Sequence, residues 1–120
     1  MREKFRFENL RIWQSAIALT DELFDIADLL EGRRLYRFAE QLRGASLSIT
    51  NNIAEGSGSS SNRDFANFLN YSRRSLYEVV NIVIMLHRRS IVSEEVKERL
   101  LLNLDALSRQ ITNFRKTLRK

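Results

Sequence analysis

The residues of this sequence that are best suited to chemistry are its arginines, several of which stand in adjacent pairs. Arginine provides 16 of the 20 basic residues, and the formal net charge is +5. A guanidinium is planar, donates two parallel hydrogen bonds to a phosphate and stacks on nucleic-acid bases. A basic surface of this kind favours an anionic partner such as RNA or DNA. The candidate nucleic-acid contacts are Arg33, Arg34, Arg37, Arg43, Arg63, Arg73, Arg74, Arg88 and Arg89.

Ordinary solvation of the surface is the alternative explanation for this charge. Cations near the C-terminal ends of helices offset the negative end of the helix dipole. A net charge of +5 also lies within the usual range for a small domain. Composition therefore leaves both explanations open.

Other kinds of reactive or metal-binding site lack the residues that they need. The chain has no cysteine, which excludes disulfides, thiol nucleophiles and thiolate metal sites. His87 is the only histidine, so the Glu-x-x-His pairs of di-iron bundles are absent. Glu94, Glu95 and Glu98 are explained by the start of a helix, and the glycine-serine run over 56–61 lacks the Gly-Lys of a Walker loop. We therefore expect no catalytic, metal-binding or cofactor-binding residue, no cofactor, and a protein that is not an enzyme.

The elements that carry the arginines are expected to be long helices. The chain has no proline and only four glycines, which favours uninterrupted helices. Gly32 and Gly56 are expected to adopt the left-handed conformation beyond the ends of the first two helices. Short connections make neighbouring helices antiparallel. We predict an all-α fold, an antiparallel up-down-up-down four-helix bundle forming a single domain over 1–120. Apolar residues spaced by three and four place its helices at approximately 8–30, 34–55, 62–89 and 94–118.

The first predicted helix carries two apolar stripes, although one buried face requires only one. Two stripes indicate a helix that is covered from two directions, by its own bundle and by another subunit. Large exposed apolar patches usually mark association. We therefore expect a homo-oligomer, in which the candidate subunit interface is Ile12, Leu19, Leu23 and Ile26.

A polar run over 41–58 is unfavourable for a helix. It is rich in serine, threonine and asparagine, and it places Glu55 at the negative end of the helix. One interpretation is structural: the small residues let another helix approach, Glu55 pairs with an arginine such as Arg63, and Asn51 or Asn52 satisfies the loop backbone. The other interpretation makes this end of the bundle a polar surface that recognises nucleic acid or a partner protein.

No segment resembles a targeting or membrane-spanning sequence. The N-terminus has mixed charge and lacks the apolar region of a signal peptide. The longest apolar stretch, over 79–86, is far shorter than the ~20 residues that span a bilayer. We expect a cytoplasmic protein without a membrane partner.

A pattern of residues extends over nearly the whole chain. It comprises Phe7-Glu8-Asn9-Leu10, Trp13-Gln14, Ala16, Gln41-Leu42-Arg43, Ala45, Ser48-Ile49, Asn52-Ile53-Ala54-Glu55-Gly56, Phe65, Phe68-Leu69, Ser75-Leu76 and Glu78. By this pattern the chain resembles the bacterial four-helix-bundle proteins encoded in the intervening sequences of 23S ribosomal RNA genes. Within it, Asn52, Glu55 and Gly56 are motif residues with an expected structural role. Gly44 and the Arg73-Arg74 pair depart from the residues expected at their positions.

The resemblance implies a bundle that assembles into a homopentameric ring and has no established catalytic activity. The chain is also similar to the accessory protein of diversity-generating retroelements, which shares the fold and binds nucleic acid and a reverse transcriptase. The leading hypothesis is a non-enzymatic homo-oligomer that binds structured RNA or another nucleic acid through arginines. The alternative is a protein-interaction scaffold without direct nucleic-acid binding. The expected partners are further copies of the chain, RNA or DNA, and a partner protein.

Overall fold

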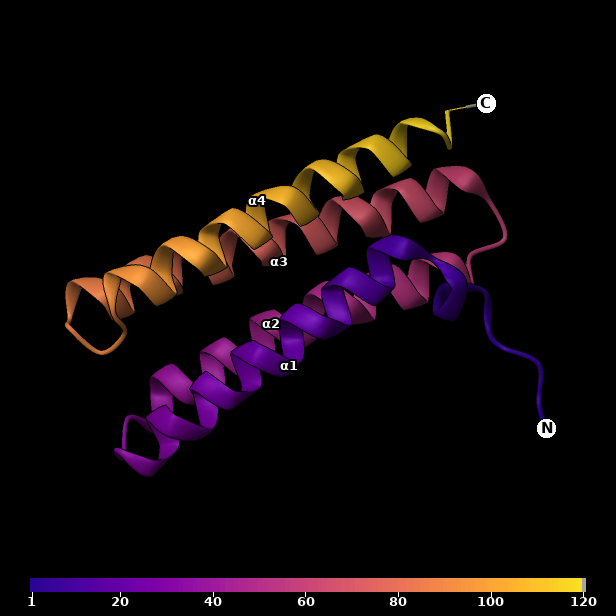
Figure 1. Ribbon diagram of the computed structural model, residues 1–120. Helices are drawn as coiled ribbons and strands as arrows, with labels where there is room; N and C mark the ends of the chain where they lie inside the picture. The colour runs from indigo at the N-terminus through magenta and orange to yellow at the C-terminus, as the bar shows by residue number, and fades with distance from the viewer. Residues whose placement is uncertain (120) are drawn as a thin grey trace.

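Four long helices pack side by side in the computed structural model, which describes residues 1–119 (Figure 1). Successive helices run antiparallel. The α1–α2 and α3–α4 turns lie at one end of the bundle, and the α2–α3 connection, the N-terminus and the end of α4 lie at the other (Figure 1). This arrangement confirms the all-α, up-down-up-down four-helix bundle. In chain order the elements are a short 3-10 helix η1 (Arg6–Asn9), α1 (Arg11–Gly32), α2 (Tyr36–Ser57), α3 (Asn62–Arg88) and α4 (Glu94–Lys116).

The first helix begins later than the sequence predicts, because residues 6–9 form a separate turn. The Glu8 carboxylate accepts the backbone N–H of Phe5 at 2.7 Å and two hydrogen bonds from the Arg2 guanidinium. The hydrogen bonds from Arg2, followed by that from Phe5, lower the pKa of Glu8 to about 2. The Phe7 ring then packs edge-on against Trp13 of α1, with 5.1 Å between ring centroids. The Glu8 carboxylate thus orders the N-terminal segment, and the contact between Phe7 and Trp13 attaches the segment to α1.

The two glycines expected to end helices do not take the left-handed conformation. Gly32 is the last residue of α1, Gly56 lies inside α2, and no glycine has a positive φ within residues 1–119. Arg34 (φ 61°) and Ser90 (φ 60°) adopt that conformation instead, just beyond α1 and α3. The prediction for the glycines is therefore wrong, because Gly32 is still part of α1 and α2 continues one residue past Gly56.

Buried apolar side chains form one core cluster between the helices. Ile12, Leu19 and Leu23 belong to this core, and Ile26 packs against it half-buried. The prediction of a subunit interface is therefore wrong for Ile12, Leu19 and Leu23, which the core of the same chain buries; for the half-buried Ile26 it stays a prediction. The physical reason is that α2 and α4 both contact α1, so the two directions of cover come from the same chain.

The polar run in α2 is explained by the packing of this helix between α1 and α3. Ser46 is completely buried and its hydroxyl donates to the Leu42 carbonyl of its own helix at 2.6 Å. Ser72 of α3, also buried, donates to the Ile49 carbonyl of α2 at 2.8 Å. Small side chains with local hydrogen bonds allow two helices to approach α2 without leaving buried polar groups unpaired.

Gly56 allows α2 and α3 to approach each other closely near the α2–α3 connection. A Cβ atom at this position would lie 2.7 Å from Phe68 Cβ and 2.8 Å from Phe65 Cδ1. Phe65 is buried, and its ring packs edge-on against Phe114 of α4, with 5.5 Å between centroids. The glycine therefore makes room for an aromatic contact that joins three helices.

Candidate nucleic-acid interface

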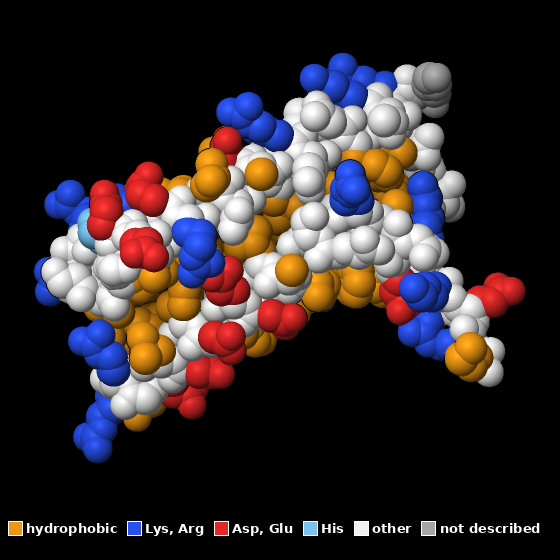
Figure 2. Space-filling model, in the orientation of Figure 1, with side chains coloured by type: hydrophobic (Ala, Val, Ile, Leu, Met, Phe, Trp, Pro, Cys, Tyr) orange, Lys and Arg blue, Asp and Glu red, His pale blue; other side chains and the backbone are white. Residues whose placement is uncertain are grey.

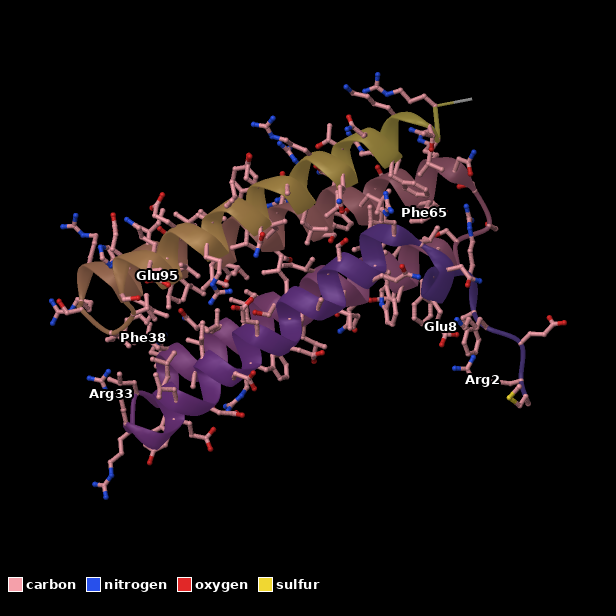
Figure 3. The ribbon with its side chains drawn as sticks, in the orientation of Figure 1. Arg2, Glu8, Arg33, Phe38, Phe65 and Glu95 are labelled. Carbon is pink, nitrogen blue, oxygen red and sulfur yellow. The ribbon has the colours of Figure 1, made fainter. Side chains whose placement is uncertain are left out.

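The structure brings five of the nine predicted arginines to the end of the bundle that carries the α1–α2 and α3–α4 turns. All five are exposed, and none makes an ion pair with any residue in 1–119. Figure 3 shows the side chain of Arg33 beyond the ends of the helices. We call this group the turn-end cluster; its members are Arg33, Arg34, Arg37, Arg88 and Arg89.

Arg34 occupies a backbone conformation that favours glycine. Its N–H donates to the Glu31 carbonyl and the N–H of Leu35 to the Leu30 carbonyl, both at 2.9 Å, which closes the end of α1. A residue with a Cβ in this conformation costs roughly 1–2 kcal/mol relative to glycine. Strain of this kind clusters at functional positions. An exposed arginine held in this conformation therefore makes the α1–α2 turn a candidate binding site.

Three acidic residues close to the turn-end cluster, Asp28, Glu31 and Glu94, are paired with other cations. Arg43 of α2 donates to Asp28 and to Glu31 of α1 at 2.6 Å each, and these hydrogen bonds raise the pKa of Arg43. At the start of α4, Lys97 lies 2.8 Å from Glu94 and lowers the pKa of that carboxyl group. Arg43 is therefore engaged within the chain and is not available to a phosphate in this geometry. Its ion pairs neutralise two carboxylates near the cluster.

The three remaining predicted arginines lie in other parts of the bundle. Arg73 is half-buried between α3 and α4, where its Nε donates to Ser108 Oγ at 3.1 Å and its guanidinium lies over the Tyr77 ring. Arg74 lines a polar groove between α2 and α3. Arg63 lies at the opposite end of the bundle, in the first turn of α3. The nine predicted arginines therefore do not form one continuous site.

Of the three motif residues, Asn52 and Gly56 make specific contacts in the structure. Asn52 Nδ2 donates to the Ser48 carbonyl at 2.8 Å, so it binds its own helix and does not satisfy the loop. Gly56 provides the close approach described above. Glu55 is exposed and makes no ion pair with a described residue, so its expected pairing with an arginine is wrong.

Acidic side chains are concentrated on α1. Figure 2 shows them along this helix and also near the start of α4, and it shows basic side chains at both ends and along the visible face. The acidic stripe contains the exposed residues Asp21, Asp25 and Asp28. At the end opposite the turn-end cluster, Arg115 and Arg119 line one pocket together with Arg63. These two arginines were not among the predicted contacts, although antiparallel pairing places the start of α3 beside the end of α4.

Within residues 1–119, no three His, Asp or Glu side chains are grouped as metal ligands. The helices described in the structure include none with an apolar segment long enough to cross a membrane.

Comparison with known proteins identifies one family. The model of the 23S rRNA-intervening sequence protein family matches residues 8–113, which include α1, α2 and α3 completely and most of α4. No curated protein matches the sequence.

Proposed function

The chain belongs to the 23S rRNA-intervening sequence protein family, and on that premise we propose a non-enzymatic homo-oligomer that binds structured RNA or another nucleic acid. The proposed contact is the turn-end cluster, and the proposed place of action is the cytoplasm. One observation carries the proposal: five exposed arginines in two turns and the adjoining helix ends lie at one end of the bundle without an acidic partner in residues 1–119. The description of the family names no reaction.

The proposed binding is electrostatic and directed at the phosphate backbone. Each guanidinium pairs bidentately with phosphate oxygens, and such contacts position a protein on nucleic acid without reading its sequence. Binding should therefore depend on the fold and charge of the nucleic acid and weaken steeply with salt. Assembly of several copies would multiply the number of clusters presented to one RNA molecule and so raise the avidity.

The direct experiment measures binding of a fluorescently labelled RNA hairpin by anisotropy at about 50 mM salt. The test protein carries Arg33→Gln, Arg37→Gln and Arg89→Gln, which remove three charges from exposed positions of the cluster. Hydrogen bonds to charged groups contribute about 1.5–3 kcal/mol when well formed, so even partial loss of three should weaken binding at least tenfold.

The matched control carries Arg11→Gln, Arg99→Gln and Arg109→Gln, three exposed arginines outside the cluster. It has the same net charge as the test protein, and it should bind RNA within about threefold of the unmodified chain, because it keeps all five clustered guanidinium groups. Equal weakening in both proteins would assign the binding to net charge and refute the cluster.

Arg34 offers a second test, in which stability and binding change in opposite directions. Arg34→Gly relieves the left-handed backbone and should stabilise the fold by roughly 1 kcal/mol. The same substitution should weaken RNA binding. A glycine variant that is more stable and binds RNA unchanged would contradict the assignment of Arg34 to the interface.

The proposed homo-oligomer, a pentamer by the resemblance described above, needs a different interface from the one that the sequence indicated. Support comes from large apolar side chains that are exposed at several positions along α3. We call this group the α3 ridge; it comprises Tyr71, Tyr77, Ile84 and Met85. Large exposed apolar residues on one helix favour association.

Light scattering on the full chain tests this assembly. We expect a mass of several times the 14.1 kDa of one chain, which falls to a single chain in the double variant Ile84→Glu, Met85→Glu. Leu102→Glu, at an exposed position of α4, is the control and should leave the assembly intact. A single-chain mass for the unmodified protein in dilute solution would refute self-association.

An interaction scaffold without nucleic-acid binding is the second candidate function. The acidic stripe of α1, exposed over Asp21, Asp25 and Asp28, favours it, because such a stripe suits a basic partner protein. Capture of one specific polypeptide that survives nuclease treatment, without any RNA binding at low salt, would support the scaffold over the proposed function.

A further inference from the structure

A second basic feature lies at the end of the bundle opposite the turn-end cluster. Here the first turns of α3, the end of α4 and the segment after it border a half-open cavity of about 470 Å³. Its lining includes Arg63 from α3, Arg115 from α4 and Arg119 from the segment after α4. Three guanidinium groups from separate positions in the sequence therefore surround one cavity.

The guanidinium of Arg115 is held in place by the backbone of the neighbouring helix. Its Nε donates to the Ala66 carbonyl of α3 at 3.1 Å, across the boundary between the two helices. This bond uses one of the five N–H donors of an arginine, and the terminal Nη groups keep four. Arg115 is thus a half-buried, oriented cation at the wall of the cavity, unlike a mobile surface side chain.

Helix stabilisation does not explain all three arginines. Cations near the C-terminal end of α4 offset its negative dipole, which accounts for Arg119 and in part for Arg115. Arg63 has the opposite position: it lies in the first turn of α3, at the positive end of the helix dipole, where a cation is unfavourable. No carboxylate lines the cavity in the part of the chain that is described. An anion in this cavity would offset the positive charge of the three arginines and would be favoured by the positive end of α3.

The dimensions and the remaining lining indicate the size of that anion. Ligand sites in proteins typically have volumes of roughly 300–1,000 Å³, and 470 Å³ exceeds what a lone phosphate occupies. Leu118 supplies an apolar wall, and the side-chain amides of Asn62 and Asn67 supply donors and acceptors. These side chains suit a small organic group that is attached to the anion.

We propose that this cavity binds a phosphomonoester, in which the arginines hold the phosphate and the asparagines and Leu118 hold the attached nucleoside or similar group. A nucleoside monophosphate and the 5′-phosphate end of a nucleic-acid strand share this chemistry. The site is separate from the turn-end cluster, so each can fail without the other.

Calorimetric titration of the full chain with AMP, inorganic phosphate and adenosine tests the proposal. AMP should bind, phosphate more weakly, and adenosine not detectably. Arg63→Gln should reduce the AMP affinity at least tenfold, and circular dichroism should show an intact fold, because Arg63 is exposed and removing a cation there does not disfavour the helix. The control Arg11→Gln should bind AMP like the unmodified protein.

Two further arms separate the sources of the phosphate and the two basic sites. If strand ends are the ligand, a DNA oligonucleotide with a 5′-phosphate should compete with AMP better than the same oligonucleotide with a 5′-hydroxyl group. If the two oligonucleotides compete equally, the ligand is a small molecule. The triple variant of the turn-end cluster should bind AMP unchanged. Failure of AMP to bind, or binding that Arg63→Gln leaves unaffected, would overturn the phosphomonoester site.

Discussion

Substitution of alanine for two glycines of α2 should change stability in opposite directions. Gly44 is exposed and has no side chain or neighbouring helix within 4 Å of a built Cβ, whereas the Cβ at Gly56 would meet Phe68 at 2.7 Å and Phe65 at 2.8 Å. In an open helix interior, Gly→Ala stabilises by roughly 0.8–1 kcal/mol. Gly44→Ala should therefore raise the free energy of unfolding by about this amount.

For Gly56→Ala the same helix preference is outweighed by overpacking. Inserting a methyl group into a packed core costs typically 1–3 kcal/mol. The upper part of that range, roughly 2–3 kcal/mol, applies here because the opposing contact is a backbone-proximal Cβ that cannot rotate away. After subtracting up to about 1 kcal/mol of helix preference, a net destabilisation of roughly 1–2 kcal/mol remains. The two variants should therefore differ by about 2–3 kcal/mol.

Urea unfolding, measured at one protein concentration by the fluorescence of the single tryptophan and by circular dichroism, gives both free energies. For a chain of this length the variants should melt roughly 4 °C apart for each kcal/mol of difference. A Gly56→Ala protein as stable as the unmodified chain would refute the claim that this glycine sets the α2–α3 distance.

Three further predictions follow from the core and the N-terminal segment. Leu23→Glu places a charge in a completely buried position, so it should prevent folding, at a cost of at least about 4 kcal/mol. A variant that is folded by circular dichroism and has the mass of a single chain by light scattering would instead place Leu23 in a subunit interface. Because the pKa of Glu8 is lowered to about 2 from 4.5, its contribution is fully present above pH 4.5 and is lost as the pH falls toward 2. The Trp13 fluorescence should therefore change in that window, and the change should be absent in Glu8→Gln, whose segment is already released; an identical titration of that variant would contradict the role of Glu8. Ser72→Ala removes a buried 2.8 Å hydrogen bond to Ile49 and should destabilise the fold by about 1 kcal/mol in urea unfolding; no change would show that the bond contributes nothing.

The architecture follows from the apolar pattern, because helices without proline joined by short turns have few ways to pack. Helix ends were less predictable. Glycine is the residue most often found in the left-handed conformation after a helix, but here Arg34 and Ser90 adopt that conformation, and Gly32 and Gly56 do not. At Gly56 the requirement for space beside Phe65 determines the residue, and spacing within one helix does not reveal a contact between helices.

The error at the predicted subunit interface has a specific physical origin. Two apolar stripes on α1 correctly indicated cover from two directions. The sequence cannot state whether a covering surface comes from the same chain or another, and in this bundle α2 and α4 provide both for Ile12, Leu19 and Leu23. The exposed apolar residues of the α3 ridge were less evident, since tyrosine and methionine also occur singly on ordinary surfaces.

The candidate nucleic-acid contacts were predicted by residue type but not by arrangement. Charge count alone treats all nine arginines alike. The structure separates Arg43, which pairs with two acids of α1, and Arg73, which bonds Ser108, from the exposed arginines of the turns. Position at or just beyond a helix end was the feature that indicated which arginines are unpaired, because a residue there has fewer neighbours with which to pair.

The slope of RNA affinity against salt concentration tests the central claim most directly. For the unmodified chain the logarithm of the association constant should fall steeply with the logarithm of salt between about 50 and 200 mM. Removing Arg33, Arg37 and Arg89 should reduce the magnitude of that slope by roughly 2–3 per chain, since each phosphate contact contributes about 0.7–0.9. The matched control Arg11→Gln, Arg99→Gln, Arg109→Gln should keep the original slope. No RNA binding at 50 mM salt, or the same slope in both triple variants, would contradict binding through the turns.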